Sequence, residues 1–419
     1  MITVSTMGRP RLCWLLAGFF LFASFSALAA NKRETKAVVS ARGPALQDRV
    51  ADGLAEARLI EVYKLIGQSR NQEAMVKAEQ LVRAVPSFQL AQLVYGDLLT
   101  ARTRPLKTFG DVPESSARRA RAVLDALREE SLQRINALRA RPAPGTAPSQ
   151  FLTLSTRSRH AIAVDASKSR LYLFQNSASG MKLIADYYIS VGKAGTSKTA
   201  EGDQRTPLGV YYITSNLDPK SLKDFYGSGA LPISYPNVLD NKRGKTGSGI
   251  WLHGTPPNQF ARPPLATDGC VVLANPDLMH IIKTVEVRTT PVVIASKLDW
   301  VPLHTIRSAA RPFEEILQAW RDAKTSGNLQ HLLSFYSADF SVNGKTLSQW
   351  TPTLVAEMKK TKGRTIQLKD VSYLHWLDAN DTMVVTFGEV ADGTRTGWTK
   401  RQYWSRQGNQ WKIFFEGLI

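Results

Sequence analysis

The apolar positions of the chain follow two different spacings. Between residues 58 and 140 they recur every three to four residues, for example at Leu59, Val62 and Ile66, as on one face of an α-helix. After residue 150 they form short runs of aromatic and branched residues between Gly, Asn, Ser and Pro, which is typical of β-strands. The runs that predict strands are 170–174, 186–191, 209–214, 250–253 and 291–295.

The last part of the chain combines both patterns. An amphipathic helix with Leu317 and Trp320 is predicted from about residue 311, and strand-like segments follow near the end of the chain, at 382–390, 397–404 and 410–415. The proline-rich stretch 141–148 is predicted to be a linker. We therefore expect a multidomain fold with an N-terminal α-helical segment, a mostly-β middle domain and a C-terminal α+β domain.

The first thirty residues resemble an export signal. Arg9 and Arg11 precede an apolar run over 12–25, and 27–29 supplies small residues for cleavage. The sequence predicts a signal peptide over 1–29 that is removed from the mature protein. A retained membrane anchor is the alternative, because the run has about the minimum length that crosses a bilayer.

The charge of the chain favours anionic partners. The 419 residues include 54 Lys and Arg against 35 Asp and Glu, a formal net charge of +19. However, the basic clusters at 242–245 and 359–364 contain no interleaved aromatic residues and no nucleic-acid-binding motif. We expect a solvated basic surface and no nucleic-acid partner.

Cysteine use points to a single thiol. Removal of the signal peptide takes away Cys13 and leaves Cys270 as the only cysteine of an exported protein. An intramolecular disulfide is then excluded, so Cys270 is either buried and inert or used for its reactivity.

A histidine that could act as a base for this thiol precedes it in the sequence. His253 ends a predicted strand, and Cys270 follows seventeen residues later, directly after Gly269. A thiol with a pKa of about 8.5 needs a base to become a nucleophile, and His253 could take its proton. The glycine allows the backbone N–H groups of Gly269 and Cys270 to approach a reacting carbonyl. The alternative is that His253 only satisfies hydrogen bonds at the end of its strand.

Four ordered segments resemble the L,D-transpeptidase (YkuD-like) catalytic domain. They are 190–193, 205–211, His253-Gly254 and Thr267-Asp268-Gly269-Cys270, with Asn275 after the next strand, so the resemblance covers about 158–296. It implies that Cys270 is the nucleophile and His253 the general base. It also implies that the backbone carbonyl of Gly254 orients the imidazole and that the Gly269 N–H belongs to the oxyanion hole.

One position departs from the commonest family pattern. The family usually has a histidine where this chain has Asp268. A carboxylate there would repel an anionic substrate and raise the pKa of the thiol, unless Asp268 faces outward. Thr267 and Asp268 are therefore candidate substrate-binding residues, and the substrate preference is left open.

The other segments resemble known domains as well. Residues 59–101 are similar to one tetratricopeptide-type unit, and the C-terminal part resembles NTF2-like domains; this order is similar to that of a cell-shape L,D-carboxypeptidase group. His331, His375 and Asp378 could line an NTF2-type pocket, but we assign them no catalysis. The predicted domains are a signal peptide (1–29), a helical tetratricopeptide-like domain (30–140), a Pro-rich linker (141–150), a YkuD-like catalytic domain (151–300) and an NTF2-like domain (301–419).

The resemblance implies acyl transfer on peptidoglycan stem peptides in the periplasm. A thioester at Cys270 would release a terminal D-residue and be resolved by an amine, as in a transpeptidase. The alternative is an L,D-carboxypeptidase that resolves it with water, and a non-catalytic wall-binding scaffold is a third hypothesis. We expect no metal and no cofactor. A cell-wall or envelope protein could bind through the helical or the NTF2-like domain.

Overall fold

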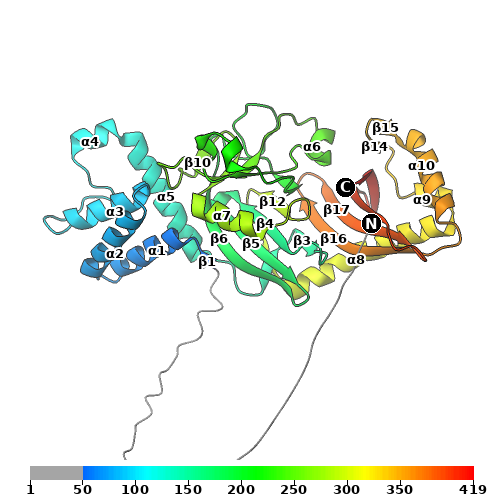
Figure 1. The fold of residues 1–419 in the computed structure, drawn as a ribbon, viewed down its shortest axis with the longest axis horizontal. Helices are drawn as coiled ribbons and strands as arrows, with labels where there is room; N and C mark the ends of the chain where they lie inside the picture. Colours follow the sequence, from blue (N-terminus) through cyan, green and yellow to red (C-terminus); the bar gives the residue numbers. More distant parts are fainter. Residues whose placement is uncertain (1–50) are drawn as a thin grey trace, which may run out of the picture. The chain divides into compact units, whose positions relative to one another are not determined.

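The computed structural model describes residues 51–419 (Figure 1). The predicted signal peptide over 1–29 lies outside these residues. The described chain contains helices first, then a mostly-β domain, then a second sheet with its own helices, so the predicted multidomain fold class is confirmed. Within residues 51–419, no helix combines the length and the apolar character that a bilayer span requires.

The N-terminal segment is a set of short helices around one small core. Leu59, Val62 and Leu65 of the first helix, together with Ala78 and Leu81 of the second, are buried in it. The helical spacing of the sequence continues over 116–140, but the chain forms two helices there, because the backbone of Ala120 leaves the helical region. The helices are α1 (Leu54–Gly67), α2 (Asn71–Ala84), α3 (Gln89–Thr100), α4 (Glu114–Arg119) and α5 (Arg121–Arg139).

The middle domain is built on one mixed sheet with the strand order β7-β12-β4-β5-β6-β11-β9-β8. Most neighbours are antiparallel, but β4 and β12 pair in parallel, and so do β9 and β11. The predicted strand runs are therefore found, with Tyr172, Tyr211 and Val293 among the residues that fill the cores on its two faces. The strands are β4 (His160–Asp165), β5 (Arg170–Ser177), β6 (Gly180–Gly192), β7 (Gly209–Tyr212), β8 (Ala230–Pro232), β9 (Trp251–His253), β11 (Val271–Leu273) and β12 (Pro291–Ala295).

Smaller elements complete this domain. The strands β1 (Ala51–Asp52) and β10 (Leu265–Thr267) both pair with β6 outside the main path. The helices α6 (Val238–Lys242) and α7 (Asn275–Thr284) lie after β8 and β11, and short 3₁₀ turns occupy Ala166–Lys168, Pro219–Ser221 and Asp224–Tyr226.

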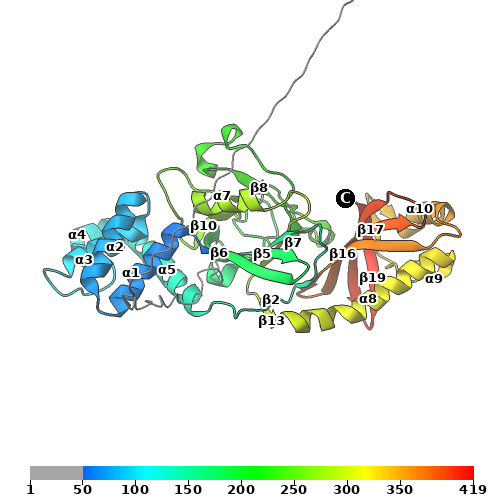
Figure 2. The ribbon, with the colours of Figure 1, turned by 60° about the horizontal axis from the view of Figure 1, so that its bottom comes forward.

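The C-terminal domain is a curved antiparallel sheet packed against helix α8 (Leu303–Ser326) (Figure 2). Trp320 of α8 and Trp404 of the sheet are fully buried in its core. The sheet strands are β16 (Ile366–Leu377), β17 (Asp381–Ala391), β18 (Trp398–Gln407) and β19 (Gln410–Leu418); the remaining elements are α9 (Leu329–Leu333), β14 (Ser341–Val342), β15 (Lys345–Thr346) and α10 (Leu347–Lys360).

Two short strands join the middle and C-terminal domains. Strand β2 (Thr146–Pro148) pairs with β13 (Trp300–Pro302), and β3 (Phe151–Thr153) adds a fifth strand to the C-terminal sheet beside β16. The predicted linker 141–148 thus ends in a paired strand. A segment that precedes the catalytic region in sequence completes the sheet of the domain that follows it.

The basic cluster at 242–245, predicted to be a solvated surface, is partly exposed, and each of its basic side chains lies in an ion pair. Lys242 pairs with Asp339, and Arg243 makes a bidentate contact with Asp378 at 2.5 and 2.7 Å, while Lys245 pairs with Asp240. The carboxylates that pair with Lys242 and Arg243 lie 97 and 135 positions away, so charge counting along the chain could not identify these two pairs. The cluster therefore contacts the C-terminal domain.

A buried ionic network joins the N-terminal helices to the middle sheet. Glu56 of α1 accepts hydrogen bonds from Arg134 of α5 at 2.6 Å and from Arg170 of β5 at 2.8 Å, and Arg170 also pairs with Asp186. Burial alone would raise the pKa of Glu56, but Arg170 and Arg134 outweigh it and lower that pKa to about 2. The helical segment is thus fixed to the middle domain by buried ion pairs, in which loss of one partner would leave the others as uncompensated buried charges.

Candidate functional site

Strand register brings the predicted histidine and cysteine to neighbouring strands. His253 is the last residue of β9, and Cys270 directly precedes β11. In this parallel pair Val271 is opposite Leu252 and Val272 is opposite His253, which places Cys270 beside Trp251. Because side chains alternate along a strand, His253 and Trp251 share one face of the sheet, and Cys270 joins that face. A strand spacing of about 4.8 Å and a rise of about 3.3 Å per residue put their Cα atoms roughly 8 Å apart.

His253 is buried and held in one orientation. Its side chain is 1% exposed, and Nδ1 lies 2.7 Å from the carbonyl oxygen of Gly254. A carbonyl only accepts, so Nδ1 carries the hydrogen and Nε2 keeps its lone pair. The rings of Tyr226 and Phe225 lie with centroids 5.0 and 5.7 Å from the imidazole. Burial lowers the pKa of His253 to about 4, against a smaller opposing effect of the Gly254 carbonyl. The imidazole is therefore neutral at neutral pH.

Cys270 is half-buried and carries a protonated thiol. Its Sγ–H donates to the carbonyl oxygen of Gly249 at 3.5 Å. Burial raises the pKa of the thiol, and the Trp251 N–H and the Arg262 charge act in the opposite direction. A neutral thiol and a neutral imidazole on one face of the sheet form a pair in which a proton can move as the sulfur attacks.

The turn before Cys270 is closed by Thr267. The Thr267 hydroxyl donates to the Cys270 carbonyl at 2.7 Å and accepts the Gly269 N–H at 3.1 Å. Gly269 has φ +121°, and a Cβ there would lie 2.7 Å from the Arg205 carbonyl oxygen, so only glycine fits this position. Both hydrogen-bonding capacities of Thr267 are used inside the protein. Its position favours a structural role in the turn over contact with a substrate.

Asp268 faces outward. Its side chain is 68% exposed and pairs with Lys193 Nζ at 3.0 Å, with Gln204 Nε2 at 3.4 Å. The charge of Asp268 still acts on the thiol and raises the pKa of Cys270, as a smaller effect than burial.

Asn275 organises the turn that follows His253. Its Oδ1 accepts the backbone N–H groups of Ser228 at 2.9 Å and Thr255 at 3.2 Å, and its Nδ2 donates to the Thr255 carbonyl at 2.9 Å. A Cβ on Gly254 would lie 2.1 Å from Oδ1. The carboxamide thus fixes the backbone whose carbonyl holds the imidazole.

Sequence reasoning missed Arg262, Phe225 and Tyr226, which surround the pair. Phe225 and Tyr226 lie in the 3₁₀ turn Asp224–Tyr226, and Arg262 lies on an irregular segment. Neither segment is long and regular enough for residue spacing to predict side-chain direction. Arg262 is 8% exposed, and its guanidinium lies 4.4 Å from the centroid of the Phe225 ring. The presence of an arginine in the loop between the histidine and the cysteine was the one signal available.

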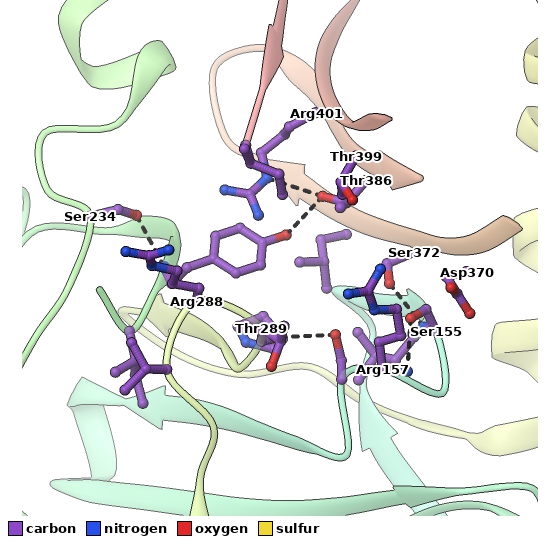
Figure 3. A pocket seen from close by; sticks show the side chains of 18 of the residues that line it. Ser155, Arg157, Ser234, Arg288, Thr289, Asp370, Ser372, Thr386, Thr399 and Arg401 are labelled. Carbon is purple, nitrogen blue, oxygen red and sulfur yellow. Dashed lines mark hydrogen bonds between the residues drawn. The ribbon is translucent and has the colours of Figure 1, made fainter. Parts of the chain in front are cut away.

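A cavity of about 540 Å³ lies between the middle domain and the C-terminal sheet, and neither His253 nor Cys270 lines it (Figure 3). Arg157, Arg288 and Arg401 line it, and the Arg401 guanidinium stacks on the Tyr212 ring at 3.5 Å while its Nε donates to Thr386. None of the predicted site residues lines this cavity.

The polar residues singled out in the C-terminal domain are used in other contacts. His375 pairs with Asp381, and Asp378 pairs with Arg243, while the ring of His331 packs against Phe335. In residues 51–419 no three His, Cys, Asp or Glu side chains gather in a way that could hold a metal ion.

Comparison with known families identifies two domains. Residues 159–294 match the YkuD family model, the L,D-transpeptidase catalytic domain, and residues 313–417 match the Cds6 C-terminal NTF2-like domain. The first match contains His253, Gly254 and the 267–270 turn. No curated protein matches the chain.

Solved structures show the same fold. The structure of Bd1075 from Bdellovibrio bacteriovorus is similar with a TM-score of 0.56 at 23% identity, over 65% of this chain and 98% of the other. The helical cell shape determining protein Pgp2 from Campylobacter jejuni is similar with a TM-score of 0.52 at 22% identity, over 64% of this chain and 95% of the other. At these identities the likeness concerns the fold.

Proposed function

Because residues 159–294 form an L,D-transpeptidase (YkuD) catalytic domain, we propose that this chain transfers the acyl group of a peptidoglycan stem peptide through a thioester on Cys270. The observation that carries the proposal is the placement of a neutral imidazole and a thiol on one face of neighbouring strands, within that domain. The proposed substrate bond joins the L-centre of a diamino acid to a terminal D-residue.

The acylation step uses the residues described above. As the Cys270 sulfur bonds to the scissile carbonyl carbon, its proton passes to Nε2 of His253, whose Nδ1–H stays on the Gly254 carbonyl. The N–H groups of Cys270 and Gly269 stabilise the oxyanion. For this the Gly269 N–H turns from the Thr267 hydroxyl, where it lies at 3.1 Å, towards the substrate. The C–N bond then breaks, and the imidazolium gives its proton to the amine of the leaving D-residue.

Deacylation reverses these roles. The amine of a second stem peptide attacks the thioester carbonyl, His253 takes its proton, the C–S bond breaks and the thiolate is protonated again. The product is a cross-link, as in an L,D-transpeptidase.

A second candidate is an L,D-carboxypeptidase, in which water takes the place of the amine and the stem peptide is shortened. It is favoured by a catalytic domain followed by an NTF2-like domain, and by the likeness to a protein named for determining helical cell shape, which has a similar fold over 64% of this chain. We propose that the protein acts in the periplasm after export through residues 1–29.

One experiment separates these functions. Purified mature protein is incubated with isolated stem tetrapeptides, and the products are read by mass spectrometry. Loss of a terminal residue identifies a carboxypeptidase, and a joined product identifies a transpeptidase. Cys270→Ser, which keeps the shape of the side chain, should abolish either product and show an unchanged circular dichroism spectrum. No product from the wild type would instead support a wall-binding scaffold.

A further inference from the structure

Arg262 is a buried cation beside the thiol. The residue is 8% exposed, and its charge acts on Cys270, as does that of Lys198. The neighbouring lysines have partners, since Lys193 pairs with Asp268 and Lys198 with Asp203. In the described part of the chain, by contrast, no carboxylate lies within salt-bridge distance of the Arg262 guanidinium.

An unpaired buried charge is costly. Burying an ion without a counterion costs several kcal/mol in proteins, and an arginine cannot escape by losing its proton. Burial does lower the pKa of Arg262, yet the group stays cationic at any physiological pH. Within the chain, Asp268 acts on Arg262 from beyond salt-bridge distance, and Asp268 is already paired with Lys193. A close anionic partner for the guanidinium therefore has to come from outside the chain.

The backbone around Arg262 is fixed on both sides. The Tyr188 hydroxyl donates to the Arg262 carbonyl at 2.9 Å, and the Ser190 hydroxyl donates to the Pro263 carbonyl at 2.5 Å. On the N-terminal side, Phe260 N–H donates to the Ser87 carbonyl at 3.1 Å. A guanidinium on such a fixed loop needs little ordering when a ligand arrives.

Phe225 completes the wall of this site. Its ring lies 4.4 Å from the guanidinium carbon of Arg262 and 5.7 Å, between centroids, from the His253 imidazole. Phe225 itself is 45% exposed. The Phe225 ring thus covers one face of the Arg262 guanidinium. The N–H groups of the guanidinium point outward in its plane, where they can donate to a ligand.

We propose that Arg262 binds a carboxylate of the stem peptide that lies within one residue of the scissile carbonyl, and so determines which peptide end can reach Cys270. This inference rests on the proposed function. A planar guanidinium matches a carboxylate with two parallel hydrogen bonds. Two carboxylates of the substrate lie at this range: that of the leaving terminal D-residue and that on the side chain of the diamino acid.

Three synthetic peptides distinguish the two sources. One carries both carboxylates, the second has a C-terminal amide, and the third has an amidated diamino acid side chain. Each is assayed by kcat/KM with wild type, Arg262→Met and Arg262→Lys. Wild type should prefer the free acid over one of the two amides by about 10- to 100-fold, the effect of losing one charge-assisted hydrogen-bonding partner. Whichever amide is the poor substrate identifies the carboxylate.

Arg262→Met should lose this preference, so that the ratio of kcat/KM between the free acid and the poor amide falls to about one. Its activity on all three peptides can also fall together, because the charge that it removes lowers the pKa of Cys270. Arg262→Lys should retain a part of the preference, since it keeps the charge and loses the fork. Arg159→Met is the matched control, because Arg159 is exposed and pairs with Glu286 at 2.9 Å. An unchanged preference in Arg262→Met, with or without an equal loss on all three peptides, would overturn the inference.

Failure of the proposed function has a different signature. If wild type turns over none of the peptides, binding of the same acid and amides to Cys270→Ala protein is measured by calorimetry. If the protein binds the free-acid peptide more tightly than an amide, and Arg262→Met removes this difference, the result supports the carboxylate site without any turnover. Equal binding of acid and amides refutes it, whatever the protein catalyses.

Discussion

Phe88, which follows the second helix of the N-terminal segment, packs its ring against Phe260 in the loop between His253 and Cys270, with centroids 4.2 Å apart. The helical segment therefore contacts the catalytic domain at the loop that carries Arg262. The helical segment thus packs against the loop of the candidate site, through a contact that the sequence alone does not indicate.

Phe88→Ala should lower the kcat/KM of the enzyme by about tenfold, because the loop loses its packing partner and a misplaced site residue costs rate. It should also destabilise the protein by about 3 kcal/mol. Leu81→Ala, which empties the same helical core without a ring contact to the loop, is the control for stability. Equal activities of these two variants would contradict a specific role of the Phe88–Phe260 contact.

The acid limb of activity should lie at low pH. His253 acts as a base only when neutral, and burial lowers its pKa to about 4. The kcat/KM should therefore rise as pH increases through about 4 and be flat around pH 6.5, the usual value for histidine. A pH–rate profile with its inflection near pH 6.5 would show an exposed imidazole in the working enzyme.

Glu56→Gln should lower the free energy of unfolding by about 3–5 kcal/mol in urea, because it leaves Arg134 and Arg170 buried with less negative charge. Glu61→Gln on the same helix removes an exposed pair with Lys77 at 3.2 Å, and should cost less than about 1 kcal/mol. The depressed pKa of Glu56, about 2, also stabilises the fold above pH 4.5, and this stability is lost as pH falls through about 2. Similar effects of both variants would contradict the network.

Gly269→Ala should reduce the kcat by at least about tenfold, because the added Cβ would meet the Arg205 carbonyl oxygen at 2.7 Å and displace the turn before Cys270. Gly244→Ala is the matched control. Gly244 also has a left-handed backbone, φ +69°, but nothing lies within 4 Å of its added Cβ. Loss of activity in both variants would point to backbone strain alone.

The elements with a regular period could be predicted from the sequence. The helices around Leu59 and Leu81, and the strands that end at His253 and contain Val293, follow from spacing, since one buried face decides each of them. The break in the helix at Ala120 could not be predicted from the sequence, because the residues on both sides of it favour helix. The pairing of Arg243 with Asp378 joins residues 135 positions apart, and no local pattern specifies it.

The site was predictable in part for a related reason. His253 lies at the end of a predicted strand, and both His253 and Cys270 lie within segments that resemble a known family. Arg262 lies on a loop that is held by hydrogen bonds with Tyr188 and Ser87, and Phe225 lies in a short 3₁₀ turn. The direction of their side chains follows from the tertiary structure only.

The addition of strand β3 to the C-terminal sheet has a consequence for the design of fragments of this protein. Its pairing of Thr153 with Tyr373 covers the edge of β16. A fragment that starts at residue 301 would leave that edge with unpaired N–H and C=O groups, which are a template for association between copies. An expression fragment that contains 151–153 should stay monomeric where the shorter one aggregates.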